Sequence, residues 1–114
     1  MGININQASF GELNGKAVSL KQITGRQFDL VEMLSILFES LENRYRLLQS
    51  GDADGLMLSY NEVLYMRKNT VRLRKGSIAF DSTIDHVTND GRLITTGSSQ
   101  TEFQVGEVSW EKVY

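Results

Sequence analysis

The sequence predicts an α+β fold in which a short strand and a long amphipathic helix precede a small all-β segment. Three patterns predict it: an alternating apolar run at the start, a helical apolar stripe in the middle, and alternating strand patterns from residue 70 onward. With 114 residues, 40% of them apolar, the chain has room for one domain or one and a half, with a real core.

The composition excludes several classes of protein. A formal net charge of −2 argues against general affinity for nucleic acid, and the absence of cysteine excludes a disulfide framework and a thiolate metal site. Charged or amide residues interrupt the longest apolar stretches, so the sequence predicts no membrane span. No signal region follows Met1, and the myristoylation pattern fails at Asn6. We therefore expect a cytoplasmic protein.

The chain begins with a short alternating run in which Asn4 separates Ile3 from Ile5, and Gln7 follows. This alternation predicts a buried strand that ends at a polar site.

The clearest pattern predicts a long helix over about residues 29–50. Asp29 and Glu32 have the spacing of a capping box at its start, and Gly51 supplies a left-handed stop at its end. Its apolar residues recur at three- and four-residue spacing: Leu30, Leu34, Leu37, Leu41, Tyr45 and Leu48. A coiled-coil seam is the alternative, but Val31 and Phe38 widen the stripe into a face better suited to covering a sheet.

A second, shorter helix is predicted over about residues 59–66, and alternation begins at Thr70. Residues 78–87 form a long strand that we expect to bend near Asp81-Ser82, and Asn89-Asp90-Gly91 marks a tight hairpin turn. Four or five short strands are too few for a large sandwich, so residues 67–114 are predicted to form a small SH3-like β-barrel. The domain boundary would fall near residue 66.

Three features suggest sites, and each has a simpler explanation. Ser50–Gly55 imitates a calcium loop, but Ser50 and Asn61 replace its first carboxylate and its bidentate glutamate, so a polar turn after a helix is favoured. His86, the only histidine, follows Asp85 and has no second histidine or cysteine to complete a metal site. A basic cluster could contact phosphates, although a solvated strand face is favoured: Arg67, Lys68, Arg72, Arg74 and Lys75.

Short motifs, taken in order, resemble the biotin protein ligases, which attach biotin to carboxylase carrier proteins. Gly2–Asn6 matches the second half of the family's strand motif G-[IV]-G-[IL]-N-x-N, and Ser19-Leu20 matches its Ser-Leu element. Asp90–Leu93 resembles the family's x-D-G-x-L hairpin, and Gly106–Ser109 resembles its closing G-E-[IV]-S. The resemblance covers nearly the whole chain.

The resemblance implies that the chain is a C-terminal fragment. Residues 1–66 would be the remnant of an α/β catalytic domain, its strand and covering helix, and residues 67–114 the SH3-like C-terminal barrel. The intact form would make biotinyl-5′-AMP from biotin and ATP, with Mg²⁺ on the phosphates, and transfer biotin to a lysine of a biotin carboxyl carrier domain. The adenylation loop G-R-G-R-x-G and the lysine of K-W-P-N-[DE] do not occur here. We therefore assign no catalytic residue and no metal ligand to this chain, and expect it to be inactive alone, with no cofactor bound.

The resemblance also implies a few site residues. Gly2 would line the biotin pocket, and Asn4 would lie at the border of the biotin and nucleotide sites. Glu107 would lie on the barrel edge near the nucleotide. Some members place an arginine four residues later, but here that position is Glu111, and Lys112 follows. Glu107 and Lys112 are accordingly assigned to the nucleotide site or to the domain interface.

Two alternatives stay open: a stand-alone SH3-like binding or dimerisation module, and a nucleic-acid-binding protein, which is disfavoured by charge. If the chain is a fragment, the stripe of the long helix is exposed, and exposed apolar patches of this size drive association. We therefore expect self-association through this helix, or by strand exchange through residues 3–5.

Overall fold

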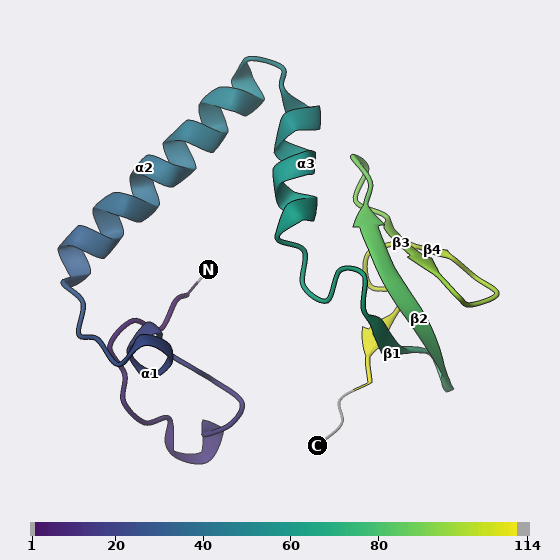
Figure 1. The fold of residues 1–114 in the computed structure, drawn as a ribbon, viewed down its shortest axis with the longest axis horizontal. Coiled ribbons are helices and arrows are strands. Elements are labelled where there is room, and N and C mark those ends of the chain that lie inside the picture. The colour runs from purple at the N-terminus through teal and green to yellow at the C-terminus, as the bar shows by residue number, and fades with distance from the viewer. Residues whose placement is uncertain (1, 112–114) are drawn as a thin grey trace. The chain divides into compact units, whose positions relative to one another are not determined.

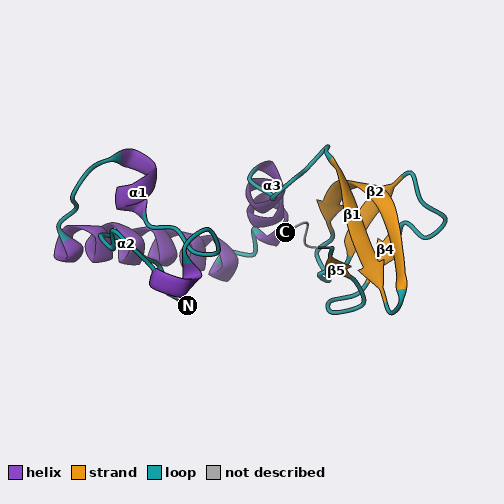
Figure 2. Cartoon of the chain, turned by 90° about the horizontal axis from the view of Figure 1, so that it is seen from below, coloured by secondary structure: helices purple, strands orange, loops and turns teal. Residues whose placement is uncertain are grey.

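The computed structural model describes residues 2–111 (Figure 1). A 3₁₀ turn at Gly11–Leu13 precedes helices α1 (Leu20–Thr24), α2 (Leu30–Gln49) and α3 (Ala53–Glu62). The strands are β1 (Thr70–Lys75), β2 (Ile78–Val87), β3 (Leu93–Thr96), β4 (Glu102–Phe103) and β5 (Ser109–Trp110). Helices and strands occupy separate parts of the chain (Figure 2), which confirms the α+β class.

The chain divides into two compact units, Met1–Tyr45 and Arg46–Tyr114, and the division falls within α2. The sequence instead suggests a domain boundary near residue 66, which stays a prediction. Among the described residues, no helix combines the length and the apolar character that crossing a membrane requires.

The start of the first unit differs from the prediction. Ile3 and Ile5 belong to no strand, and Ile3 is 53% exposed, so the expected buried strand is wrong. The carbonyl oxygens of Asn4 and Ile5 instead accept hydrogen bonds from the backbone N–H groups of Leu20 (3.0 Å) and Lys21 (2.9 Å). These donors lie in the first turn of α1, where a helix leaves its N–H groups unpaired. The N–H groups at the start of α1 thus pair with the carbonyl groups that a neighbouring strand would otherwise bind.

A reciprocal capping box starts α1. The Ser19 hydroxyl accepts a hydrogen bond from the backbone N–H of Gln22 (3.1 Å), and the Gln22 side chain accepts one from the Ser19 N–H (3.1 Å). The same hydroxyl donates to the carbonyl of Gln7 at 2.6 Å. Ser19 is buried, and its hydrogen bonds join the N-terminal segment to the start of α1.

Helix α2 forms nearly as predicted. The Asp29 carboxylate accepts a hydrogen bond from the backbone N–H of Glu32 at 2.9 Å, as expected of a cap. Gly51, at φ 86°, lies in the left-handed region that ends the helix. None of the twenty residues of α2 is buried.

Helix α3 begins six residues before its predicted start. Asp52 caps it, accepting a hydrogen bond from the backbone N–H of Gly55 at 3.0 Å. The segment Ser50–Gly55, predicted as a polar turn, therefore contains the start of α3. Met66 (φ 59°) and Lys68 (φ 64°) then take left-handed conformations that a continuing helix forbids. The prediction of a helix over residues 59–66 is therefore wrong in both bounds.

The second unit contains a five-stranded antiparallel sheet with the order β4-β3-β2-β1-β5. Its core consists of Val71, Leu73 and Ile84, and Phe103 is buried as well and stacks on Phe80. The register of β2 shifts between Ile84 and His86, a few residues after the predicted bend at Asp81-Ser82.

The sheet is open. Strands β4 and β5 are its two edges, and no pairing between them closes it within residues 2–111. The predicted strands are therefore present, but the closed SH3-like barrel is not confirmed. The predicted Asn89–Gly91 turn is present: Gly91 has φ 83°, and its N–H donates to the Thr88 carbonyl at 2.9 Å.

Candidate functional site

The N-terminal segment and α2 enclose an apolar groove of about 400 Å³ within the first unit. One wall consists of Ile3, Ile5 and Leu20, so the two alternating isoleucines of the sequence face the helix. The other wall consists of residues from the first half of α2: Met33, Leu34, Ile36, Leu37 and Ser40.

Gly2 and Asn4, the two predicted biotin-site residues, alternate with these isoleucines and do not line the groove. Both are exposed. A Cβ atom on Gly2 would meet nothing within 4 Å, so no contact of the described chain requires glycine there. The Asn4 amide donates to the carbonyl of Val18 at 3.4 Å, and its side-chain oxygen has no partner within residues 2–111.

Asn6 is the residue of this segment whose role sequence reasoning missed. Its side chain donates to the carbonyl of Phe28 (2.8 Å) and accepts from the N–H of the same residue (2.9 Å), 22 positions away. The Asn6 side chain thus pairs with Phe28 as the backbone of a neighbouring strand would. It attaches the N-terminal segment to the residues just before α2. The N-x-N spacing was the available signal, because an asparagine side chain can hydrogen-bond to backbone groups as readily as to a ligand.

Glu107 is held by three partners. Its carboxylate accepts hydrogen bonds from the Lys75 ammonium (2.5 Å), the Gln100 amide (3.0 Å) and the backbone N–H of Gln104 (2.9 Å). The Lys75 contact, followed by the Gln104 N–H, lowers the pKa of Glu107 to about 2. Glu107 therefore joins β1 to two loops of the sheet, a structural role that the sequence did not indicate.

Glu111, at the position where some ligases place an arginine, binds the basic cluster instead. Its carboxylate accepts from the Arg72 Nε at 2.9 Å and from the Arg74 guanidinium, and both contacts lower its pKa, that of Arg74 more. Lys112 lies outside the described residues.

The remaining cations of the cluster also have partners. Lys68 pairs with the Asp85 carboxylate, and the guanidinium of Arg67 donates to the backbone carbonyls of Asp85 (3.2 Å) and Asn61 (2.9 Å). The guanidinium and ammonium groups of the cluster are therefore paired with carboxylates and carbonyls of the sheet unit, in ion pairs that are largely exposed. The nucleic-acid alternative is not tested by these contacts and stays disfavoured on charge alone.

The calcium-loop and metal interpretations find no support in residues 2–111. Asp52 caps α3, and Asp54 accepts a hydrogen bond from the Asn89 side chain at 2.6 Å. His86 Nδ1 lies 2.7 Å from the Asp85 carboxylate, which Lys68 also binds. No three His, Cys, Asp or Glu side chains of this part of the chain come together as metal ligands do.

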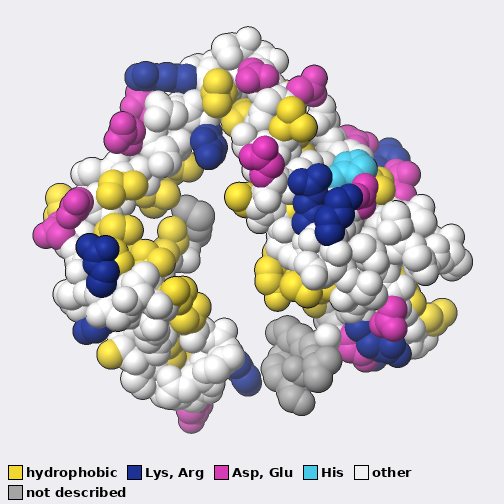
Figure 3. Space-filling view, in the orientation of Figure 1, with side chains coloured by type: hydrophobic (Ala, Val, Ile, Leu, Met, Phe, Trp, Pro, Cys, Tyr) yellow, Lys and Arg dark blue, Asp and Glu magenta, His cyan; other side chains and the backbone are white. Residues whose placement is uncertain are grey.

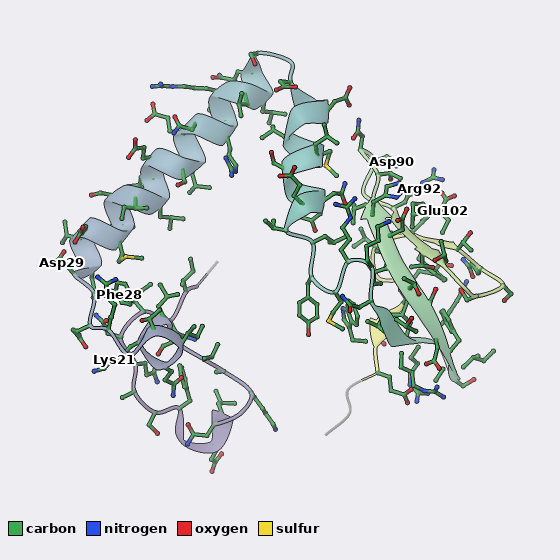
Figure 4. All side chains as sticks on the ribbon, in the orientation of Figure 1. Lys21, Phe28, Asp29, Asp90, Arg92 and Glu102 are labelled. Carbon is green, nitrogen blue, oxygen red and sulfur yellow. The ribbon has the colours of Figure 1, made fainter. Side chains whose placement is uncertain are left out.

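The hairpin motif Asp90–Leu93 has a structural explanation too. Arg92 pairs with Asp90 (Nε to Oδ2, 2.8 Å) and with Glu102 on β4, and the three side chains lie together at one end of the sheet (Figure 4). The Thr88 hydroxyl, more than Arg92, lowers the pKa of Asp90. These contacts fasten the β2–β3 turn to the edge strand.

The predicted site residues therefore fall into two groups. Gly2 and Asn4 belong to the first unit, beside Asn6 and the groove, whereas Glu107 belongs to the second. Within each unit, hydrogen bonds hold these residues: Asn6 is bound to Phe28 in the first, and Glu107 to Lys75 in the second.

Comparisons with known proteins give one kind of match. No family model matches the chain, and no curated protein sequence does so significantly. Among solved structures, the chain is similar to the biotin protein ligase of Aquifex aeolicus in complex with biotin and ATP, with a TM-score of 0.78 and 18% sequence identity. The match covers 97% of this chain and 48% of that one. The chain has the fold of about half of a biotin protein ligase.

The apo structure of the same ligase matches with a TM-score of 0.77 and 18% identity, over 97% of this chain and 51% of that one. The chain thus spans about half the length of the ligases that it matches. The resemblance seen in the sequence motifs is confirmed at the level of the fold, and the helices and sheet described above are the elements that the ligase fold shares with this chain.

Proposed function

We propose that the chain is the C-terminal part of a biotin protein ligase, and that it contributes part of the biotin site and the SH3-like domain to the intact enzyme. The observation that carries the proposal is the alignment of 97% of the chain with a ligase structure that holds biotin and ATP. The Gly2–Asn6 motif supports it independently, because the ligase strand motif places glycine and asparagine in the same order.

In this proposal the N-terminal segment forms one edge of the biotin site. Gly2 has open space where a side chain would be, which would let a ligand approach its backbone closely. The Asn4 side-chain oxygen has no partner within residues 2–111 and is available to accept a hydrogen bond. Asn6 is committed to Phe28, so its role is to position this segment.

Glu107 is proposed to lie at the interface between the sheet domain and the nucleotide site, together with Lys112. Its carboxylate keeps a negative charge and a fixed direction, because Lys75, Gln100 and Gln104 hold it. Glu111 is bound to Arg72 and Arg74, so it cannot replace an adenylate-binding arginine.

The intact enzyme would join biotin to ATP and pass the biotinyl group to a lysine of a biotin carboxyl carrier domain in the cytoplasm. Biotin and ATP are its substrates. The Mg²⁺ would lie on the ATP phosphates, as the family resemblance implies, and no residue of 2–111 is proposed as its ligand. The adenylation loop and the catalytic lysine are absent from the sequence, so this chain by itself is proposed to be inactive.

A stand-alone binding module is the second candidate. The sheet unit has its own core around Leu73 and Ile84, which is what an independently folding module needs. Such a module would need neither the Gly2–Asn6 segment nor biotin.

A titration followed by ¹⁵N–¹H NMR spectroscopy separates the two candidates. We expect a non-hydrolysable biotinyl-adenylate analogue, at millimolar concentration, to shift the amide signals of residues 2–6, with AMP alone as the control. The Asn4→Ala variant should shift less than the unaltered chain. Because the chain carries only part of the site, only weak binding is expected, and a response to the analogue that AMP alone does not give would support the ligase proposal. A folded chain whose signals at residues 2–6 do not respond would contradict the contacts proposed for Gly2 and Asn4 and leave the module open.

A further inference from the structure

Strand β2, the longest strand of the sheet (Figure 1), continues past the end of its neighbour β3. It pairs with β1 from Ile78 to Thr83, but with β3 only from Thr83 onward. Strand β3 ends at Thr96, and Gly97, at φ 89°, turns the chain out of the sheet. Within residues 2–111, no strand therefore pairs with the β3 side of β2 between residues 78 and 82.

The hydrogen-bond pattern identifies which backbone groups of β2 are free. In an antiparallel sheet, successive residues direct their N–H and C=O groups alternately to one neighbouring strand and to the other. The Arg72 carbonyl accepts a hydrogen bond at 3.0 Å from the N–H just after β5, so the next residue, Leu73, is directed toward β2. Phe80, opposite Leu73, is directed toward β1. Ala79 and Asp81 are therefore directed toward the side that β3 leaves open, and we call their backbone groups the free β2 edge.

The start of β2 forms one wall of a groove of about 740 Å³ within the sheet unit. On this wall Ile78 is 67% exposed, and Phe80 is half-buried and stacks on Phe103. The opposite wall is the β3–β4 loop, Gly97–Gln100. Binding sites commonly enclose roughly 300–1,000 Å³, so the groove has room for a bound segment.

Hydrogen bonds hold the loop wall in place. The buried Ser82 hydroxyl donates to the Thr96 carbonyl at 2.9 Å and lies 3.1 Å from the Ser98 hydroxyl. The Gln100 side chain accepts a hydrogen bond from the Lys75 ammonium at 2.8 Å, which joins the loop to the end of β1. The groove is thus built before any partner arrives, and this lowers the cost of ordering it on binding.

The charged side chains around the groove occur in pairs of opposite sign. Lys75 is bound to Glu107, and Asp81 to Arg72 at 3.0 Å. Figure 3 shows the same mixing of positive and negative side chains on the visible face of the sheet unit. Because each charge has an opposite partner, the groove does not select a charged ligand, and the exposed Ile78 favours apolar side chains.

We propose that this groove binds an extended, uncharged segment of another polypeptide, which pairs with the free β2 edge as an additional strand. The N–H and C=O groups of Ala79 and Asp81 repeat at about 6.8 Å, twice the rise per residue of a strand. This repeat matches the backbone of an extended peptide. The peptide residue opposite Phe80 would lie on the same face as Phe80 and Ile78, so we expect an apolar, β-branched side chain there.

A second copy of the chain fits the groove less well than a single segment. It would bring its whole sheet to the free β2 edge, whereas the Gly97–Gln100 wall leaves room for one strand. The proposal rests on the sheet unit alone and not on the proposed ligase function, so either can fail without the other.

Amide hydrogen exchange of the full chain, followed by ¹⁵N–¹H NMR spectroscopy, tests the free β2 edge first. We expect the amides of Ala79 and Asp81 to exchange rapidly, and those of Phe80 and Ser82, which face β1, to be protected. Protection of Ala79 and Asp81 in the chain alone would overturn the proposal, because the edge would already be paired. If that protection grew with the chain concentration, it would identify a second copy as the occupant.

The probe for binding is the blocked peptide acetyl-Thr-Val-Thr-Val-Thr-amide. Its matched control is N-methylated at the threonines, which keeps the side chains but removes the N–H groups that would face β2. At a peptide concentration about ten times the dissociation constant, exchange at Ala79 and Asp81 should slow about tenfold, since about a tenth of the chain stays free. The methylated peptide should leave it unchanged. Equal effects of the two peptides, or no effect of the first at millimolar concentration, would contradict strand pairing.

A proline at position 79 removes one donor of the free β2 edge. Because the Ala79 N–H does not face β1, we expect Ala79→Pro to stay folded by circular dichroism and to bind the peptide at least about tenfold more weakly. Ala79→Val keeps the N–H and should bind as the unaltered chain does. Unchanged binding by a folded Ala79→Pro variant would overturn the proposal, and the methylated peptide decides the question if that variant does not fold.

Discussion

The side chain of Asn6 forms two hydrogen bonds with the backbone of Phe28, one to its carbonyl oxygen at 2.8 Å and one from its N–H at 2.9 Å. This pair joins the first residues of the chain to the start of α2. The second unit uses the same device: Asn61 on α3 donates to the Val87 carbonyl at 2.9 Å and accepts from the Val87 N–H at 2.7 Å. In both cases one amide replaces a missing strand partner.

Asn6→Ala should loosen the first unit. The substitution removes both bonds and leaves the Phe28 N–H and carbonyl without partners in a half-buried place, at a cost of about 2 kcal/mol. Hydrogen exchange should show faster exchange at the Phe28 amide and through α1. Asn4→Ala, which removes one exposed bond of 3.4 Å, is the matched control. Equal protection in the two variants would contradict the role given to Asn6.

Asn61→Ala should destabilise the sheet unit more strongly. Asn61 is only 9% exposed, and its removal leaves two backbone groups of Val87 unpaired at the end of β2, so we expect a loss of about 2–3 kcal/mol. Urea unfolding followed by the fluorescence of Trp110 measures it. The exposed Asn89→Ala variant, which loses only the bond to Asp54, should change the free energy of unfolding by less than about 1 kcal/mol.

The sheet unit should lose stability in acid, between about pH 4.5 and pH 2. The folded-state pKa of Glu107 is lowered from its ordinary 4.5 to about 2, chiefly by Lys75, and that of Asp85 is lowered to about 2, chiefly by Lys68. A lowered folded pKa contributes stability above the unfolded pKa, and protonation removes it as the pH falls toward 2. Urea midpoints measured from pH 6 to pH 2 should fall across this window.

Two variants isolate the contribution of Glu107 to this acid sensitivity. Glu107→Gln should flatten the pH dependence, and Lys75→Met should do the same by removing the main cause of the lowered pKa. The double variant should show little further change, since both act on one interaction. A full acid transition in Glu107→Gln would mean that other carboxylates dominate.

The basic cluster should not bind nucleic acid. Arg72 and Arg74 are bound to Glu111, and Lys75 to Glu107, so few counterions would be released on binding. Fluorescence anisotropy with labelled DNA and RNA at low salt should show no saturable binding at tens of micromolar. Salt-sensitive binding that Arg72→Gln weakens would reverse this conclusion.

The candidate site was only partly visible in the sequence. The motif Gly2–Asn6 pointed to the ligase fold. Glu107 was singled out as a neighbour of the nucleotide, which stays a prediction, and its contacts with Lys75 and Gln100 were not foreseen. The contact of Asn6 with Phe28 spans 22 positions, and that of Glu107 with Lys75 spans 32. No local pattern predicts such pairs, because they depend on how distant segments meet.

What the sequence determined by itself is the local structure with a periodic or capping signal. The α2 helix, the Asp29 cap, the Gly51 stop and the Asn89–Gly91 turn all follow from neighbouring residues, because their stabilising contacts lie within a few positions along the chain. The strand at Val71–Leu73 was predicted from its alternation, although its partners are more distant residues of β2 and β5. Only the tertiary structure decided that Ile3 and Ile5 form no strand, that α3 starts at Asp52, and that the sheet stays open. A strand exists only when a second segment supplies its hydrogen bonds, and here the end of α1 supplies them instead.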